Sequence, residues 1–134
     1  MIKTISVKSS SREELIDISR EVENAIKDLK IKNGVCYLYV PHTTAGITIN
    51  EGADPSVKKD ILKALQKIAP YGAEYAHLEG NADSHIKATL VGSSVNVFIE
   101  NGKLTLGQWQ SIFFCEFDGP RTRKVYMKVI KEVE

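Results

Sequence analysis

The sequence is poor in the features that mark membrane, secreted and nucleic-acid-binding proteins. No stretch approaches the ~20 apolar residues of a membrane span, and the N-terminus turns polar at once, so no signal peptide is expected. Lys and Arg number 18 against 17 Asp and Glu. This balance gives no general attraction to nucleic acid or an anionic membrane. We therefore predict a cytoplasmic protein with neither of these partners.

Cysteine is also scarce. The two cysteines, Cys36 and Cys115, each lie in an apolar run, which is typical of reduced packing residues and not of a disulfide scaffold. Neither has a histidine nearby in the sequence, so a nucleophilic role is not expected. With 43% hydrophobic and 26% charged residues, the 134 residues fit a single globular domain over 1–134.

Hydrophobic periodicity predicts helices and strands from the N-terminus onward. Alternation over 2–8 predicts a strand. Ser11 and Glu14 have the spacing of a capping box, and the apolar residues that follow recur at helical spacing. The sequence therefore predicts one amphipathic helix over 12–29, ended by a turn at Asn33-Gly34.

Two further helices are expected. Asp54 as N-cap and Pro55 as first helical residue begin a helix that Pro70 ends. A short third helix begins at Asp83 or Ser84 and stops at Gly92, after a loop over 71–83. Asn101-Gly102 predicts a hairpin. The remaining strands are expected at 35–40, 47–50, 95–99, 110–117 and 124–133.

These elements add up to an α+β fold. It has about seven strands in one antiparallel sheet or barrel-like core, with two longer helices and one short helix. The strands at 35–40 and 112–117, and part of 125–130, are apolar on both faces. Three helices cannot cover so much two-sided sheet, so we expect other subunits to supply a second layer.

The three histidines, His42, His77 and His85, are predicted in turns or at helix starts, beside polar residues that include Glu79 and Asp83. Three interpretations are open. The residues can bind a divalent metal such as Zn²⁺ or Mn²⁺. A histidine can act as general acid or base. The residues can also simply cap helices and close turns. The spacing matches no standard metal motif.

The segment 80–84 leads into the third helix and resembles a phosphate cradle, because free backbone N–H groups and the helix dipole point there. The carboxylate of Asp83 opposes an anion at that position. A bound metal would reconcile the two negative groups.

Trp109, the single tryptophan, begins the most apolar strand. It is either a core or interface anchor or a stacking wall for a flat ring, with Gln108 and Gln110 supplying hydrogen bonds.

Glu116 points from an apolar row of the same strand and should have a cationic partner or a metal. Arg121 and Arg123 are candidates for that pairing. They can also bind phosphate, or lie in a solvated turn.

Three separated segments resemble the YjbQ family: Pro41–Glu51 with Ala53-Asp54-Pro55, His77–Lys87, and Gly102–Ile112 with Cys115–Arg121. The resemblance covers most of the chain in order and spacing. The matching positions are His42, Thr43, Asn50, Glu51, His85, Trp109, Gln110 and Glu116, while His77 and Glu79 match one branch of the family. Gln108 and Ser111 replace residues of the commoner Gly-Thr-Trp-Gln-Gly motif.

The resemblance implies a β-rich α+β fold and a homotrimer with sites near subunit contacts. It also implies secondary thiamine-phosphate synthase activity, in which a pyrimidine pyrophosphate is joined to a thiazole phosphate and pyrophosphate is released. Charge on that leaving group is neutralised by Mg²⁺ or by Arg and Lys. The alternatives are a metal-assisted phosphate-ester hydrolase and a trimeric metal- or ligand-binding module without turnover.

These expectations assign roles to particular residues. The predicted catalytic residues are His42, His85 and Glu116. The predicted ligands of a Zn, Mn or Mg ion are His42, His77, His85, Glu79 and Asp83. The predicted substrate-binding residues, for a small phosphorylated metabolite, are Thr43, Thr44, Asn50, Glu51, Lys87, Trp109, Gln110 and Arg121.

Overall fold

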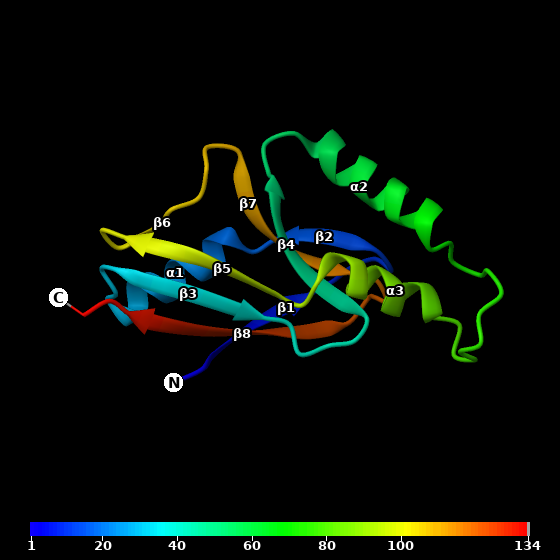
Figure 1. The fold of residues 1–134 in the computed structure, drawn as a ribbon, viewed down its shortest axis with the longest axis horizontal. Coiled ribbons are helices and arrows are strands. Elements are labelled where there is room, and N and C mark those ends of the chain that lie inside the picture. The colour runs from blue at the N-terminus through cyan, green and yellow to red at the C-terminus, as the bar shows by residue number, and fades with distance from the viewer. Residues whose placement is uncertain (134) are drawn as a thin grey trace.

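The computed structural model describes residues 1–133. Those residues form three helices and eight strands, in an α+β arrangement (Figure 1). None of the helices is both long enough and apolar enough to cross a membrane. The helices are α1 (Ser19–Leu29), α2 (Pro55–Ile68) and α3 (Ala82–Val91). The strands are β1 (Lys3–Lys8), β2 (Glu14–Asp17), β3 (Gly34–Tyr39), β4 (Ala45–Glu51), β5 (Ser94–Glu100), β6 (Lys103–Leu104), β7 (Gln110–Glu116) and β8 (Thr122–Lys131).

The predicted α+β class with an antiparallel β core is confirmed, and the strands of that core are divided between two sheets. The larger has the order β1-β8-β3-β5-β6, and the smaller has the order β2-β7-β4. The main core lies between them and includes Leu38 and Met127 from the larger sheet, Ile47 and Phe114 from the smaller, and Val22 from α1. Burying one face of each sheet in this way is the usual solution for amphipathic strands.

Strand β7 is buried on both faces, as its apolar run predicted. Ile112 and Phe114 face the main core. Phe113 and Cys115 belong to a second core, where α2 contributes Ile61, Leu62 and Leu65. The second layer over β7 therefore comes from this chain's own helix, and the expectation that another subunit must supply it was wrong for this strand.

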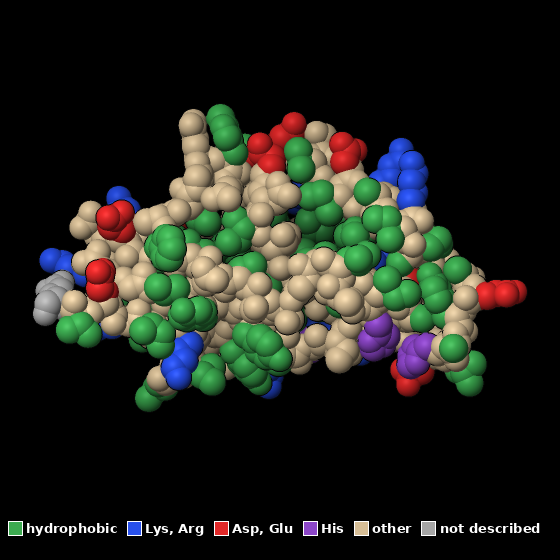
Figure 2. Space-filling model, in the orientation of Figure 1, with side chains coloured by type: hydrophobic (Ala, Val, Ile, Leu, Met, Phe, Trp, Pro, Cys, Tyr) green, Lys and Arg blue, Asp and Glu red, His purple; other side chains and the backbone are tan. Residues whose placement is uncertain are grey.

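The outer face of the larger sheet has no such cover among residues 1–133. Tyr37 and Tyr39 on β3 are 48% and 51% exposed, Phe98 on β5 is 66% exposed and Ile130 on β8 is 51% exposed. Figure 2 shows hydrophobic side chains gathered over these three strands. The strand predicted at 35–40 thus has one buried and one exposed face in the single chain.

Several local signals are confirmed. Asp54 caps α2, accepting a hydrogen bond from the Ser56 main-chain N–H at 2.9 Å, and Pro55 is the first helical residue. Gly92 ends α3. Asn101 and Gly102 both have positive φ, 52° and 79°, as the predicted hairpin between β5 and β6 requires.

The helix predicted over 12–29 was wrong in its first third. Residues 14–17 form β2, which pairs with β7, and α1 begins only at Ser19, whose N–H donates to Asp17 Oδ1 at 2.9 Å. Leu15 packs in the second core and Ile16 against the main core. In a segment of four residues, the pattern of apolar side chains cannot distinguish a strand buried on both faces from a helical turn. With β2, residues 1–133 contain eight strands, where about seven were predicted.

The predicted N-terminal caps of α1 and α3 were also wrong. Glu14 accepts a hydrogen bond from the Ser10 main-chain N–H at 2.8 Å, outside any helix, so the Ser11–Glu14 capping box does not form. Asn81, and not Asp83 or Ser84, is the N-cap of α3. Asp83 and Ser84 are instead buried within the first turn.

Candidate functional site

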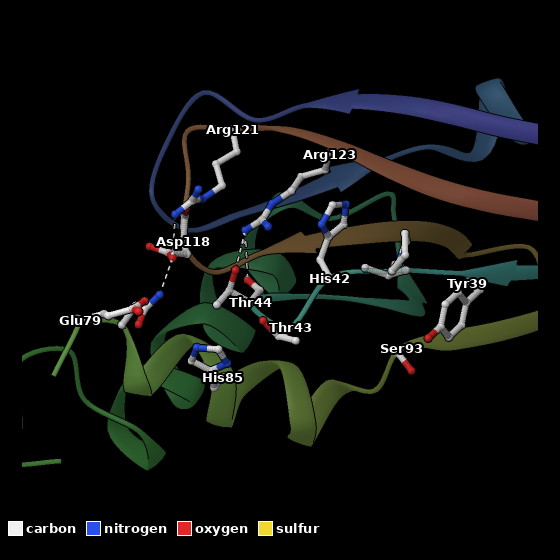
Figure 3. Close-up of a pocket in the computed structure, with 13 residues that line it drawn as sticks. Tyr39, His42, Thr43, Thr44, Glu79, His85, Ser93, Asp118, Arg121 and Arg123 are labelled. Carbon is white, nitrogen blue, oxygen red and sulfur yellow. Dashed lines mark hydrogen bonds and ion pairs between the residues drawn. The ribbon is translucent and has the colours of Figure 1, made fainter. Parts of the chain in front are cut away.

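A cavity of about 720 Å³ lies where three segments that are distant in sequence meet (Figure 3). The loop between β3 and β4 contributes His42, Thr43 and Thr44. The start of α3 and the loop before it contribute Glu79, Asn81 and His85. The turn from β7 into β8 contributes Asp118 and Arg121, and the start of β8 contributes Arg123. A smaller cavity of about 390 Å³ adjoins it and shares His42, Thr43, His85 and Ser93.

His42 is held in a defined orientation. Its Nε2 accepts a hydrogen bond from the main-chain N–H of Lys124 at 2.9 Å, so the proton of the neutral ring is on Nδ1. Nδ1 has no hydrogen-bond partner within residues 1–133, yet it is not among the buried unpaired atoms. Burial, with the charge of Arg123, lowers the His42 pKa. His42 therefore presents a neutral N–H donor.

Glu116 and Arg123 form a buried ion pair beneath the pocket. Arg123 donates from Nε to Glu116 Oε1 at 2.9 Å and from Nη2 to Glu116 and to Thr44 Oγ1. Ser9 also donates to Glu116 Oε1, at 2.7 Å. Burial alone raises the Glu116 pKa, but the bonds from Arg123 and Ser9 outweigh burial and lower it. The predicted cationic partner of Glu116 is confirmed as Arg123.

The remaining nitrogen of Arg123, Nη1, makes no hydrogen bond within the part of the chain that the structure describes. Because Arg123 lines the cavity, this guanidinium has a donor left for a ligand. Arg121, more exposed, donates to Asp118 Oδ2 at 3.1 Å and to the Asp118 main-chain oxygen at 2.7 Å. It therefore pairs with Asp118 and not with Glu116.

The first turn of α3 points its other polar side chains away from the cavity. Asp83 accepts two bonds from Arg12, at 3.0 and 3.1 Å, and one from Lys87 at 2.9 Å. Lys87, fully buried, also donates to Glu13 at 2.6 Å and to Gln66 at 2.8 Å. Burial raises the Asp83 pKa, but Arg12 and Lys87 outweigh that effect and lower it. The structure thus places Asp83 and Lys87 outside the pocket.

His77 and Glu79 lie at the rim. The His77 ring meets the His85 ring edge to face, with centroids 5.2 Å apart, and its Nε2 is 3.7 Å from Glu79 Oε2. Residues 1–133 contain no group of three or more His, Cys, Asp or Glu side chains arranged to hold a metal ion. Asp83 and His42 Nε2 already bond other residues, so the described residues do not bring the five predicted ligands together in one cluster.

Four predicted substrate-binding residues lie elsewhere. Glu51 pairs with Gln110 at the far end of β4 and β7, next to Asn50, and Trp109 accepts a main-chain bond from Gly52 at 2.9 Å. Gln110 is six residues along β7 from Glu116, about 20 Å at ~3.4 Å per residue. Trp109 is 59% exposed, so it is not a core anchor. One chain therefore holds two separate sets of polar residues, the pocket and a second set of Asn50, Glu51, Trp109 and Gln110, called here the Trp109 group.

Asn81 and Asp118 lie in the pocket although the sequence patterns assigned them no role. Asp118 lies within Cys115–Arg121, part of the third family-like segment. Asn81 lies in the 80–84 segment considered as a phosphate cradle and in the family-like segment His77–Lys87, so these segments are the signals that could have found the two residues. The position of Asn81 in the pocket follows from capping α3 and bonding Asp118 at 2.9 Å.

Comparisons with known proteins give a consistent result. The model of the family described as "UPF0047 protein YjbQ-like" matches residues 3–132. UPF0047 protein YugU of Bacillus subtilis is 52% identical over 97% of this chain and 99% of its own length. UPF0047 protein MJ1081 of Methanocaldococcus jannaschii is 53% identical over 97% of this chain and 94% of its own.

Solved structures agree with the sequence matches. A YjbQ/UPF0047-family protein from Clostridium acetobutylicum superposes with a TM-score of 0.93 at 52% identity, covering 96% of this chain and 99% of that one. A YbjQ-like protein of unknown function from Sulfolobus solfataricus also has a TM-score of 0.93, at 33% identity, covering 98% of this chain and 97% of that one. The two-sheet fold is therefore shared across a wide range of sequence identity.

Proposed function

We propose that this chain, which belongs to the YjbQ-like UPF0047 family, acts on phosphorylated small molecules and binds their phosphate in the cavity beside His42. The proposal rests on two hydrogen-bond donors in this cavity that bond no other described residue. His42 Nδ1 and Arg123 Nη1 have no protein partner within residues 1–133, and both residues line the same cavity. A guanidinium and a fixed N–H donor suit the oxygens of a phosphate group.

His85 is the candidate acid–base group. Figure 3 shows it on α3, across the pocket from His42 and Arg123. Its side chain makes no hydrogen bond within the described residues, so its ring nitrogens are available to a ligand. The pocket would then hold a phosphate near His42 and Arg123, with His85 exchanging a proton on the other side.

The specific reaction proposed is of the thiamine-phosphate synthase type. The thiazole nitrogen forms a bond to the pyrimidine methylene carbon while the carbon–oxygen bond to pyrophosphate breaks. The leaving pyrophosphate takes the electron pair of that bond and then a proton, for which His85 is the candidate donor. Arg123 and His42 would stabilise the charge that develops on that leaving group.

The assay uses purified protein, both thiamine precursors and Mg²⁺. Product is expected above background for wild type and for Ser94→Ala, which changes an exposed residue outside the cavity lining, and much less for His85→Ala. Product at background with wild type overturns the transferase assignment. Titration with inorganic phosphate then tests binding itself, which His42→Ala should weaken and Ser94→Ala should not.

One observation favours a second candidate, a ligand-binding module without turnover. Burial raises the pKa of both Cys36 and Cys115 to about 12, which leaves the thiols unreactive, so neither cysteine can serve as a nucleophile. Phosphate binding without product formation, over a panel of phosphorylated metabolites, is the result that this candidate requires.

The assembly we propose is a homotrimer with the pocket at a subunit boundary. Tyr39 lines the cavity and also belongs to the exposed outer face of the larger sheet. A second copy packed on that face would contact the edge of the pocket. The Trp109 group of that second copy would then lie near the pocket of the first, although within one chain the two are remote from each other.

A further inference from the structure

Of the two polar atoms in the Asn81 side-chain amide, only the nitrogen forms a hydrogen bond within the described residues. Its Nδ2 donates to Asp118 Oδ2 at 2.9 Å, and a carboxylate can only accept, so the identity of the two amide atoms is settled. Its Oδ1 is the single buried side-chain nitrogen or oxygen within residues 1–133 that has no hydrogen-bond partner. Such unpaired buried acceptors are rare and unfavourable in folded proteins.

Asn81 lines the same cavity as His42 and Arg123. Asp118 holds its amide in place, and Asp118 is itself held by Arg121 at 3.1 Å. The cavity therefore has two chemically different parts. His42 and Arg123 offer hydrogen-bond donors, whereas Asn81 Oδ1 and the Asp118 carboxylate offer acceptors.

Resting on the proposed phosphate site, we infer that Asn81 is a specificity-determining residue whose Oδ1 accepts a hydrogen bond from an amino or hydroxyl group of the ligand. The substrate class is then a small phosphorylated compound with such a donor on the part remote from its phosphate. A phosphorylated compound without the donor leaves Asn81 Oδ1 unpaired, and the pocket binds it less tightly.

Calorimetric titration with matched ligand pairs tests this inference. The probes are inorganic phosphate and hydroxyalkyl phosphates of two, three and four carbons, each paired with the alkyl phosphate that lacks the hydroxyl. Wild type should bind at least one hydroxyalkyl phosphate about two- to tenfold tighter than its partner, the range that one added hydrogen bond produces. Asn81→Ala should abolish this preference, and Ser94→Ala, at an exposed residue outside the cavity lining, should keep it.

The outcomes separate the two proposals. Phosphate binding with no preference for any hydroxyl compound, or a preference that survives in Asn81→Ala, overturns the role of Asn81 and leaves the phosphate site intact. Failure of wild type to bind phosphate or any phosphate ester overturns the proposed function and this inference with it. If Asn81→Ala does not fold, Asn81→Gly serves in its place, because glycine is tolerated at a helix N-cap.

Discussion

The two ring nitrogens of His42 have different surroundings, and this decides what the residue can do. Nε2 faces the Lys124 N–H at 2.9 Å, so coordination of a metal through Nε2 would require that bond to break. His77 and His85, whose rings meet edge to face, have no comparable restraint. We therefore expect a divalent metal to coordinate His77 and His85 and to leave His42 unchanged.

Nitrogen-15 NMR of the imidazole rings checks this prediction. At pH 7 we expect His42 to be neutral with its proton on Nδ1, because burial and Arg123 lower its pKa. Added Zn²⁺ should bind weakly and shift the signals of His77 and His85 only. A His42 ring protonated on Nε2, or a His42 signal that shifts with Zn²⁺, would contradict the structure and restore His42 as a metal ligand.

Glu116 is the buried carboxylate on which Arg123 depends. Replacing it, as Glu116→Gln, leaves a buried guanidinium without its counter-charge, and we expect the free energy of unfolding to fall by about 3–5 kcal/mol. Chemical denaturation at pH 7 measures the loss. The control is Glu79→Gln at the exposed rim, which should change stability little. Equal free energies of unfolding for Glu116→Gln and Glu79→Gln would show that the Glu116–Arg123 ion pair contributes little to stability.

The same carboxylate predicts an acid dependence of stability. The Glu116 pKa in the folded protein lies below the value of 4.5 taken for the unfolded chain. Its contribution is therefore complete above about 4.5 and is lost as the pH falls toward the folded-state pKa. Wild-type stability should decline over that window, and the decline should be smaller in Glu116→Gln.

At the scale of elements, α3 depends on the buried charges of its first two turns. Asp83 and Lys87 lie one helical turn apart and connect α3 to Arg12, Glu13 and Gln66. This network fixes the helix that carries His85 to the pocket. The position of His85 therefore depends on ion pairs that face the opposite side of α3.

Lys87→Met tests the network. It leaves Asp83 with Arg12 as its one cationic partner, and we expect a loss of roughly 3 kcal/mol in the free energy of unfolding. The control is Lys63→Met, because Lys63 is an exposed lysine of α2. A substrate-binding lysine would give the opposite pattern, with unchanged stability and weakened ligand binding, so thermal unfolding combined with phosphate titration decides between the two roles.

Element boundaries were least predictable where pairing partners are distant in sequence. Residues 14–17 follow a helical pattern locally, yet they form β2 because β7, about a hundred residues later, offers a strand edge beside the core. Backbone hydrogen bonds to that edge, and the burial of Leu15, outweigh a modest helical propensity. No window of local sequence contains this information.

At the scale of the whole molecule, the uncovered face of the larger sheet predicts self-association. A contiguous exposed set that includes Tyr37, Tyr39 and Phe98 is unusual for a monomer. Light scattering at micromolar concentration should report a mass of about 45 kDa, three times 14.9 kDa. Phe98→Glu places a charge in that face and should reduce the mass to that of one chain.

The matched control is Leu78→Glu. Leu78 is 94% exposed but lies in the loop before α3, outside the sheet face. This variant should keep the mass of wild type. A wild-type protein that is monomeric under the same conditions would remove the trimer and, with it, the proposal that the Trp109 group of one subunit reaches the pocket of another.

The sequence by itself determined the features that depend on neighbouring residues. The cap of α2 at Asp54 and Pro55 and the reversal at Asn101-Gly102 need only short-range hydrogen bonds and permitted φ angles. The periodicity of apolar and polar residues also indicated an α+β class. The three family-like segments identified the family, because each is recognisable as a string of residues.

Only the tertiary structure decided which polar groups share a site. It separated the Trp109 group from the pocket by about 20 Å, the length of a seven-residue strand. It assigned Arg123 to Glu116, buried Lys87 against Asp83, and brought Asn81 to Asp118. Side chains of this kind meet across sheet and helix packing, and the energy of a buried charge depends on those distant partners. That dependence is the physical reason why residue type and spacing alone left two candidate partners for Glu116 and did not reveal the partners of Lys87 and Asn81.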